Sequence, residues 1–190
     1  MKKTVILLLL FISFKSYSQD IFGGKNLAIS PQLGLFFPYS SGTLNTSFNI
    51  GVDVEYKLNP VYAFADLVYN STSRKNVDNI SGSSILEFNA GPRVYFPSSK
   101  FNYFAEVGIG IYYITKGEYK ETVNGITTQY PSVSSASPGI NFGAGLETYL
   151  TKDLNLKVKG RYHLYFGKGD EPIINTYFGI YAGVCYRLNI

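Results

Sequence analysis

Residues 154–166 read LNLKVKGRYHLYF, and this stretch decides the fold. One set of alternate positions is mostly apolar or aromatic: Leu154, Leu156, Val158, Tyr162, Leu164 and Phe166. The intervening set is mostly polar or charged: Asn155, Lys157, Lys159, Arg161, His163 and Tyr165. A period of two over so many residues predicts a β-strand with one apolar and one polar face.

The same two-faced pattern recurs along the rest of the chain. In the second half it appears over residues 102–113, 140–150 and 177–188, and in the first half near residues 27–37, 48–57, 61–70 and 84–96. Pro31 and Pro92 each remove a backbone donor, and a bulge at either position would absorb the loss. We therefore expect an all-β fold of eight antiparallel strands.

Short and long connections alternate between these strands. The segments 58–60, 97–100 and 151–153 are tight turns rich in Pro, Asn, Ser and Asp, whereas 38–44, 71–83, 116–136 and 168–175 are longer polar loops. In outer-membrane barrels the short turns face the periplasm and the long loops face outward. With an even number of strands, both termini are then expected in the periplasm.

Alternation alone does not separate a transmembrane barrel from a soluble calyx, so the composition of the two faces must decide. Nine strand glycines fall on the charged face: Gly34, Gly51, Gly91, Gly108, Gly110, Gly143, Gly145, Gly179 and Gly183. A narrow lumen needs such small residues beside large ones. Aromatic residues gather near both strand ends: Tyr56, Tyr62, Phe96, Tyr103, Tyr149 and Tyr186 by the short turns, and Phe37, Tyr69, Tyr113, Phe166 and Phe178 by the loops. Two such girdles favour an eight-stranded antiparallel transmembrane β-barrel over the calyx.

The first 18 residues are typical of a signal peptide. Met1 is followed by two lysines, an apolar run from Val5 to Phe14, and the small residues Ser16 and Ser18. The alternative, an uncleaved anchor helix, would need about twenty apolar residues. We therefore predict a cleaved signal peptide at 1–18 and one β-barrel domain at 19–190, in the cell outer membrane. Without the three lysines of the signal peptide, 14 basic residues stand against 13 acidic ones, which argues against binding of nucleic acid.

The chain ends with a second recognisable feature. Gly183 is followed three residues later by Tyr186 and five residues later by Leu188, which resembles the C-terminal signal shown to the barrel-assembly machinery, although the terminal residue is not aromatic. Together with the Ser18-Gln19 junction and the segment GAGLE at 143–147, this ending resembles the porin-like outer-membrane β-barrel domain family common in Bacteroidota. The resemblance implies fold and location, with outer-membrane lipid and the assembly machinery as partners.

The polar strand face is expected to carry a lumen charge network. Its members are Asp53, Glu55, Asp66, Glu87, Arg93, Glu106, Glu147, Lys157, Lys159, Arg161 and Arg187. An eight-stranded barrel encloses a space just filled by side chains, so these charges must pair or lose solvation. The main hypothesis is a plugged lumen in a protein with a structural or surface-interaction role. The alternative is a narrow channel for ions or small solutes.

Catalysis is the less favoured alternative. Some outer-membrane barrels modify lipid with a serine and a histidine, but His163, the single histidine, lacks a nearby His-x-Ser pairing and is expected to bond to lumen carboxylates. Cys185, the single cysteine, is expected to fill space in the lumen. Neither a cofactor nor a metal signature is present in the sequence. Two interpretations of the loop at 116–136 are open. It binds a surface ligand that the sequence does not identify, or it is a mobile, variable loop with no dedicated ligand.

Overall fold

The computed structural model describes residues 22–39, 44–98, 100–167 and 174–190. Their backbone forms the strands β1 (Leu27–Pro38), β2 (Ser47–Lys57), β3 (Tyr62–Thr72), β4 (Asp78–Asn79), β5 (Ser83–Pro97), β6 (Asn102–Lys116), β7 (Tyr119–Val123), β8 (Ile126–Tyr130), β9 (Val133–Tyr149), β10 (Leu154–Phe166) and β11 (Ile174–Leu188). No helix within these ranges is long and apolar enough to cross a membrane. The predicted signal peptide at 1–18 lies outside the described residues.

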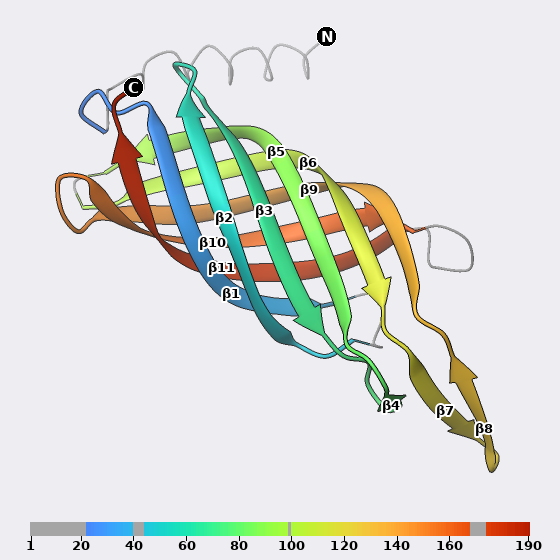
Figure 1. The fold of residues 1–190 in the computed structure, drawn as a ribbon. Coiled ribbons are helices and arrows are strands. Elements are labelled where there is room, and N and C mark those ends of the chain that lie inside the picture. The colour runs from blue at the N-terminus through green and yellow to red at the C-terminus, as the bar shows by residue number, and fades with distance from the viewer. Residues whose placement is uncertain (1–21, 40–43, 99, 168–173) are drawn as a thin grey trace, which may run out of the picture.

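Eight strands close into one antiparallel barrel in the order β1-β11-β10-β9-β6-β5-β3-β2 (Figure 1). The first strand pairs with the last, Leu27 with Leu188, which closes the wall. Following the pairing from strand to strand once around the barrel leads from Leu27 to Phe37 on the same strand. This stagger means that the strands are tilted against the barrel axis, as closure requires. The predicted eight-stranded barrel is confirmed.

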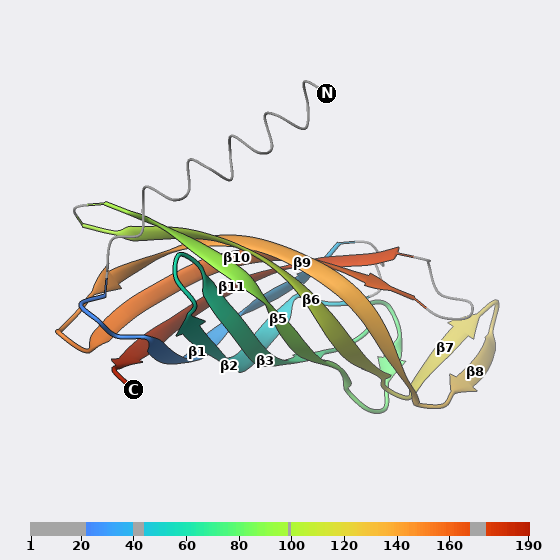
Figure 2. The same ribbon diagram turned by 90° about the horizontal axis from the view of Figure 1, so that it is seen from above.

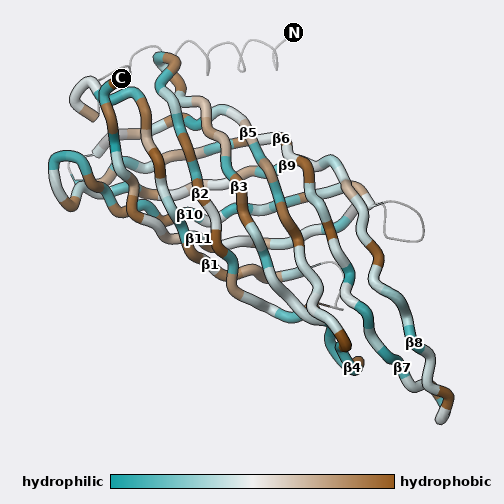
Figure 3. Tube along the Cα trace, in the orientation of Figure 1, coloured by the Kyte–Doolittle hydropathy of each residue, from teal (hydrophilic) through white to brown (hydrophobic). Residues whose placement is uncertain are grey.

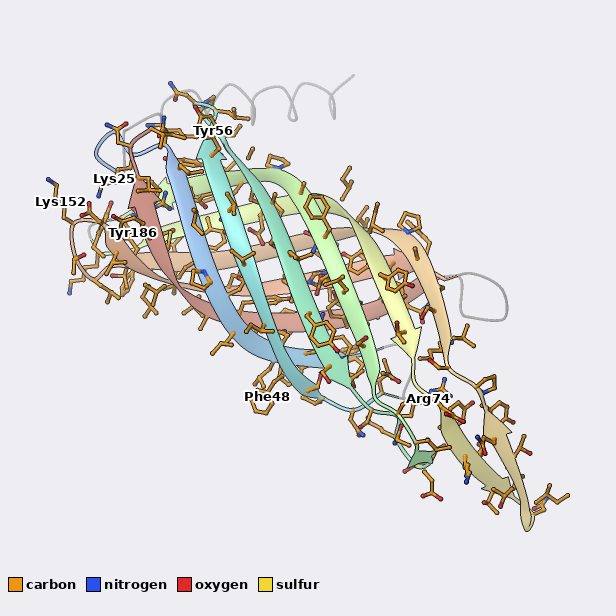
Figure 4. All side chains as sticks on the ribbon, viewed as in Figure 1. Lys25, Phe48, Tyr56, Arg74, Lys152 and Tyr186 are labelled. Carbon is orange, nitrogen blue, oxygen red and sulfur yellow. The ribbon has the colours of Figure 1, made fainter. Side chains whose placement is uncertain are left out.

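The two ends of the barrel differ as the sequence predicts. At the turn end, tight turns are closed by backbone hydrogen bonds from Leu58 to Val61, 2.8 Å, and from Ser98 to Phe101, 2.9 Å. Tyr56 and Tyr186 lie at this end, and Arg74 lies at the opposite, loop end (Figure 4). The connections between β3 and β5 and between β6 and β9 lie at the loop end (Figure 2), and most of the loops predicted at 38–44 and 168–175 lies outside the described residues.

The expectation of a plain loop over 116–136 is wrong. Strands β6 and β9 continue to Lys116 and Val133, and β7 and β8 form a hairpin beyond them. Asn124 and Gly125 form its turn, with φ angles of 53° and 81°. An Asn-Gly pair with two positive φ angles matches the twist of a hairpin, and here β-branched residues flank it. Strand β4 pairs with β7, which makes a three-stranded sheet of order β4-β7-β8.

Neither Pro31 nor Pro92 produces a bulge, although the sequence allowed one at either position. The pairing of β1 with β11 keeps the same register before and after Pro31, and the pairing of β5 with β6 does so around Pro92. Both prolines sit within the ladder without shifting it, so every residue keeps the face that the alternation assigns to it.

Hydropathy alternates along the barrel strands, as Figure 3 shows. The outward face is apolar, with Leu33 65% and Ile109 72% exposed, and the inward face is polar and buried. Outward aromatic residues gather near both ends: Tyr56, Phe96, Tyr103 and Tyr186 toward the turns, and Tyr69, Tyr113 and Phe166 toward the loops. The expectation that Tyr62 and Tyr149 belong to this girdle is wrong. Tyr62 is 4% exposed and shares the inward strand face with Asp66. Tyr149 shares the inward face of β9 with Glu147, and its hydroxyl accepts a hydrogen bond from Asn102 at 3.3 Å.

The inward glycines make room for large side chains on neighbouring strands. A Cβ atom on Gly145 would meet the Phe104 ring at 2.5 Å, and one on Gly108 would meet the Phe64 ring at 2.9 Å. Both distances are shorter than real carbon contacts allow. Large residues on one strand therefore fit against glycine on the next, which is how a narrow lumen is filled.

Candidate functional site: the barrel lumen and the loop-end sheet

The polar residues of the inward strand faces converge in the lumen. All eleven residues of the predicted charge network are buried there, from strands β2, β3, β5, β6, β9, β10 and β11. Ten of them are joined by ion pairs: Asp53, Glu55, Asp66, Glu106 and Glu147 with Arg93, Lys157, Lys159, Arg161 and Arg187. These charges balance, five against five. Glu87 stands apart from them.

Arg93 joins carboxylates from two sides of the lumen. Its Nη2 lies 2.7 Å from Asp53 Oδ2 and 2.6 Å from Glu106 Oε2, and its Nη1 also donates to Glu55. The guanidinium lies between two rings, with its central carbon 4.8 Å from the ring centre of Phe104 and 5.0 Å from that of Phe64. Arg suits this position because its planar fork can bond several carboxylates while its faces stack on rings.

Arg161 extends the network toward the loop end. Its Nε and Nη2 lie 2.8 and 2.6 Å from Glu106 Oε1, and its Nη1 donates to Asp66. Lys159 bridges two acids, with its Nζ 2.8 Å from Asp53 Oδ2 and 3.3 Å from Asp66 Oδ2. Each acid in this part of the network thus contacts more than one cation.

Arg187 anchors the network near the turn end. Its Nε and Nη2 donate to the two oxygens of Glu147 at 2.7 and 2.8 Å, and Nη2 also donates to Glu55. The Tyr95 hydroxyl lies 2.9 Å from both Glu55 Oε2 and Glu147 Oε2. Lys157 completes the group, with its Nζ 3.1 Å from Glu55 Oε2. Tyr95 belongs to the site, although no pattern in the sequence marks it.

Glu87 and His163 form a separate group on the loop side. His163 Nδ1 lies 3.2 Å from Glu87 Oε2, as expected for a histidine bonded to a lumen carboxylate. Asn70 donates to the same carboxylate at 2.8 Å. The His163 ring stacks on Tyr177 with centroids 4.2 Å apart, and its Nε2 lies 3.2 Å from the Tyr181 hydroxyl. All these contacts are to protein groups, and His163 has no exposed surface.

Apolar clusters close the lumen at both ends of the charged region. The loop-end seal consists of the buried residues Phe36, Ile85, Tyr112, Ile114, Tyr165 and Tyr177, with Leu44 packed against them. The turn-end seal consists of Phe22, Tyr62, Tyr95 and Phe104. Phe22 packs edge-on against Tyr62 and Tyr95, at 5.8 and 5.1 Å, and Arg187 lies over its ring. The alternation of residue types in the sequence is enough to place most of these rings inward. It does not place Phe22, which precedes the first strand.

The loop-end sheet carries an aromatic column on its surface. The rings of Tyr119 and Tyr130 stack at 4.7 Å across β7 and β8, and the Arg74 guanidinium lies 4.2 Å over Tyr119. Lys116 is close by, and burial together with the nearby Arg74 charge lowers the pKa of Lys116. This sheet stands beyond the barrel wall and presents its side chains to solvent.

The three residues of the predicted C-terminal signal lie on β11 in different settings. Gly183 faces the lumen opposite Gln32, and Leu188 pairs with Leu27 at the barrel closure. Tyr186 is on the outer face and is 46% exposed. Cys185 is buried and free on the inward face.

Among the described residues, no group of three or more His, Cys, Asp or Glu could hold a metal ion. The lumen acids instead contact Arg, Lys, Asn and Tyr side chains, so they serve as partners of protein cations.

Comparisons with known proteins agree with this architecture. A family model described as outer membrane protein beta-barrel domain matches residues 4–187. No curated protein matches the chain. The chain is similar to the crystal structure of neisserial surface protein A (13% identity, TM-score 0.65, covering 85% of this chain and 97% of that one). It is also similar to Ail, the attachment invasion locus protein of Yersinia pestis (13% identity, TM-score 0.57, covering 86% and 99%). At this identity the likeness concerns the fold.

Proposed function

The chain belongs to the outer membrane protein beta-barrel domain family, and from this premise we propose that it neither conducts nor catalyses but acts through the surface at its loop end. In this proposal the loop end faces the cell exterior, and the turn end and both termini face the periplasm. Residues 1–18 are removed on export. Within the family, we assign the chain to the porin-like branch common in Bacteroidota. Gly183, Tyr186 and Leu188 present the last strand to the barrel-assembly machinery, and the outward face contacts outer-membrane lipid.

The closed lumen is the observation that carries this proposal. An ion moving through the barrel would meet the loop-end seal, then ten mutually paired charges, then the turn-end seal. Separating buried ion pairs leaves charges without partners, which costs several kcal/mol for each pair. We therefore assign a structural role to the lumen charges: their ion pairs hold the strands of the barrel wall together.

The same enclosure argues against catalysis. His163 is covered by Tyr112, Tyr177 and Tyr181, and its carboxylate partner, Glu87, is also fully buried. A general base must come within hydrogen-bond reach of the proton that it removes. A lipid on the outer face of the barrel could not approach this ring without opening the wall.

A role in surface interaction is supported by the loop-end sheet, which extends the barrel strands into solvent. Neisserial surface protein A is by its name a surface protein, and the name of Ail refers to attachment and invasion. We extend a surface role to this chain as part of the proposal, since the three share a fold.

Planar-bilayer recording of the purified full chain tests the closed lumen. We expect silent bilayers, and steady single-channel currents would establish the channel alternative instead.

Orientation is tested by introducing one cysteine at Thr127 in the loop-end sheet or at Lys152 in a turn, since the native Cys185 is buried. A membrane-impermeant maleimide should label the Thr127→Cys variant in intact cells and leave Lys152→Cys unlabelled. The reverse pattern would invert the proposed topology.

A further inference from the structure

Strand β8 has an open edge. The three-stranded sheet has the order β4-β7-β8, so β7 is paired on both sides and, within the described part of the chain, β8 is paired only with β7. All five residues of β8 are exposed, Ile126 at the tip by 71%. An open strand presents unpaired backbone N–H and C=O groups, which can pair with another strand.

This edge lacks the features that usually prevent such pairing. Its sequence, ITTQY, contains no charge, no proline and no glycine, and four of its five residues are β-branched or aromatic. Exposed edges are commonly protected by charged side chains, proline or bulges. The adjacent β7 does carry charges, Lys120 and Glu121, but it lies in the middle of the sheet.

We propose that β8 pairs antiparallel with β8 of a second copy of this chain, and that the pairing is centred on Thr128. In this register Ile126 of each copy lies opposite Tyr130 of the other, and Thr127 lies opposite Gln129. Aromatic with β-branched pairs and Thr with Thr pairs are favourable across strands, and no like charges meet. The two sheets then join into one six-stranded sheet with a twofold axis, as an isologous contact requires.

The direction of the hairpin decides where the two copies sit. Figures 1 and 2 show β7 and β8 projecting past the barrel at its loop end, continuing β6 and β9. Two barrels in one membrane point their hairpins the same way, which makes their β8 strands parallel. Antiparallel pairing brings together barrels in two facing membranes. This step rests on the proposed function, because it needs the loop end outside.

The contact is weak for one pair of molecules and strong for many. Five residues on each side form an interface well below the area of a stable complex. Two membranes that each display many copies form many such contacts at once, and multivalency raises the overall affinity by orders of magnitude. We therefore expect adhesion between membranes rather than a stable dimer in detergent.

A charge swap at the symmetry centre tests the proposal. Full-length protein is reconstituted into phosphatidylcholine vesicles, and vesicle clustering is followed by light scattering. Wild-type vesicles should cluster, whereas vesicles carrying Thr128→Lys alone or Thr128→Glu alone should scatter like empty vesicles, because like charges then meet at the axis. Mixing the Lys and Glu vesicles should restore clustering. Unchanged heat-modified gel mobility shows that the variants remain folded.

Disulfide trapping supplies a matched control for the register. Thr128→Cys should cross-link between clustered vesicles, because the two residues face each other at the axis. Ile126→Cys, on the same strand face, should not, because the two copies lie far apart along antiparallel strands. Failure of the mixed vesicles to cluster, or cross-linking of Ile126→Cys, overturns the proposal. Wild-type vesicles that do not cluster also overturn the pairing of β8. The proposed function is tested separately by the bilayer recordings: silent bilayers support it whether or not vesicles cluster, and conduction refutes it.

Discussion

Replacing Arg161 with Met should destabilise the barrel without opening it. Arg161 donates to Glu106 at 2.8 and 2.6 Å and also to Asp66, and none of the three side chains is exposed. Breaking a buried pair costs about 3–5 kcal/mol. The cost should fall near 3 kcal/mol, because Glu106 keeps Arg93 and Asp66 keeps Lys159. Methionine retains most of the side-chain volume, so the loss of packing is small.

The free energy of unfolding can be measured by guanidinium titration in lipid vesicles, alongside the temperature at which the heat-modified gel band is lost. Both should fall for Arg161→Met, and planar bilayers should stay silent because the two seals are untouched. Adding Glu106→Gln to Arg161→Met restores the balance of charge, and the double variant should regain at least about 1 kcal/mol through coupling of the two sites. Replacing Lys25, whose pair with Asp153 is partly exposed, should have much less effect.

Two results would refute this reasoning. The first is an Arg161→Met protein as stable as the wild type, which would mean that the buried pairs do not hold the wall. The second is a double variant less stable than the single one. That result would mean that the Glu106 carboxylate, left without Arg161, is not what destabilises the single variant.

Three further predictions follow from other parts of the barrel. Tyr186→Asp should reduce inserted protein far more than Tyr103→Asp, a change at an outer tyrosine of nearly equal exposure, and equal insertion of the two would remove the targeting role. Glu87→Gln should cost less stability than Glu106→Gln in the same titration, since Glu87 contacts no Arg or Lys among the described ion pairs and Asn70 Oδ1 is free to accept from the new amide. Lys25 holds the pKa of Asp153 below its ordinary value, chiefly by a hydrogen bond. The stabilisation from this pair should therefore be complete above pH ~4 and lost as the pH falls through the lowered pKa, and NMR titration should show that pKa rise in Lys25→Ala.

The alternation of residue types was enough to predict the barrel and the inward set of charges. Because each strand has a period of two, a charged residue such as Lys157 fixes the face of every other residue on its strand. The pairing inside the lumen could not be predicted, since it depends on the stagger of the strands. Arg93 meets Asp53 across the lumen because of this stagger, and no local pattern in the sequence reports it.

Two features were missed for different reasons. The β7–β8 hairpin has a clear signal, Asn124-Gly125 between Val123 and Ile126, but the polar composition of 116–136 favours a loop. Phe22 had no such signal, because it lies before the first strand and its place depends on Tyr62 and Tyr95, which reach it from other strands. Outward and inward aromatic residues also look alike near strand ends, which explains the errors at Tyr62 and Tyr149.

The charge network also bears on how one register is selected. A slip of two residues between neighbouring strands keeps every side chain on its face, so hydrophobicity alone does not prevent it. Such a slip between β5 and β6 would move Arg93 away from Glu106, its direct partner across the pair, and would leave both buried without that contact. Unpaired buried charge costs far more than a shifted apolar contact on the lipid face. The lumen charges therefore make the observed stagger the favoured one, and with it they determine where the loop-end hairpin leaves the barrel.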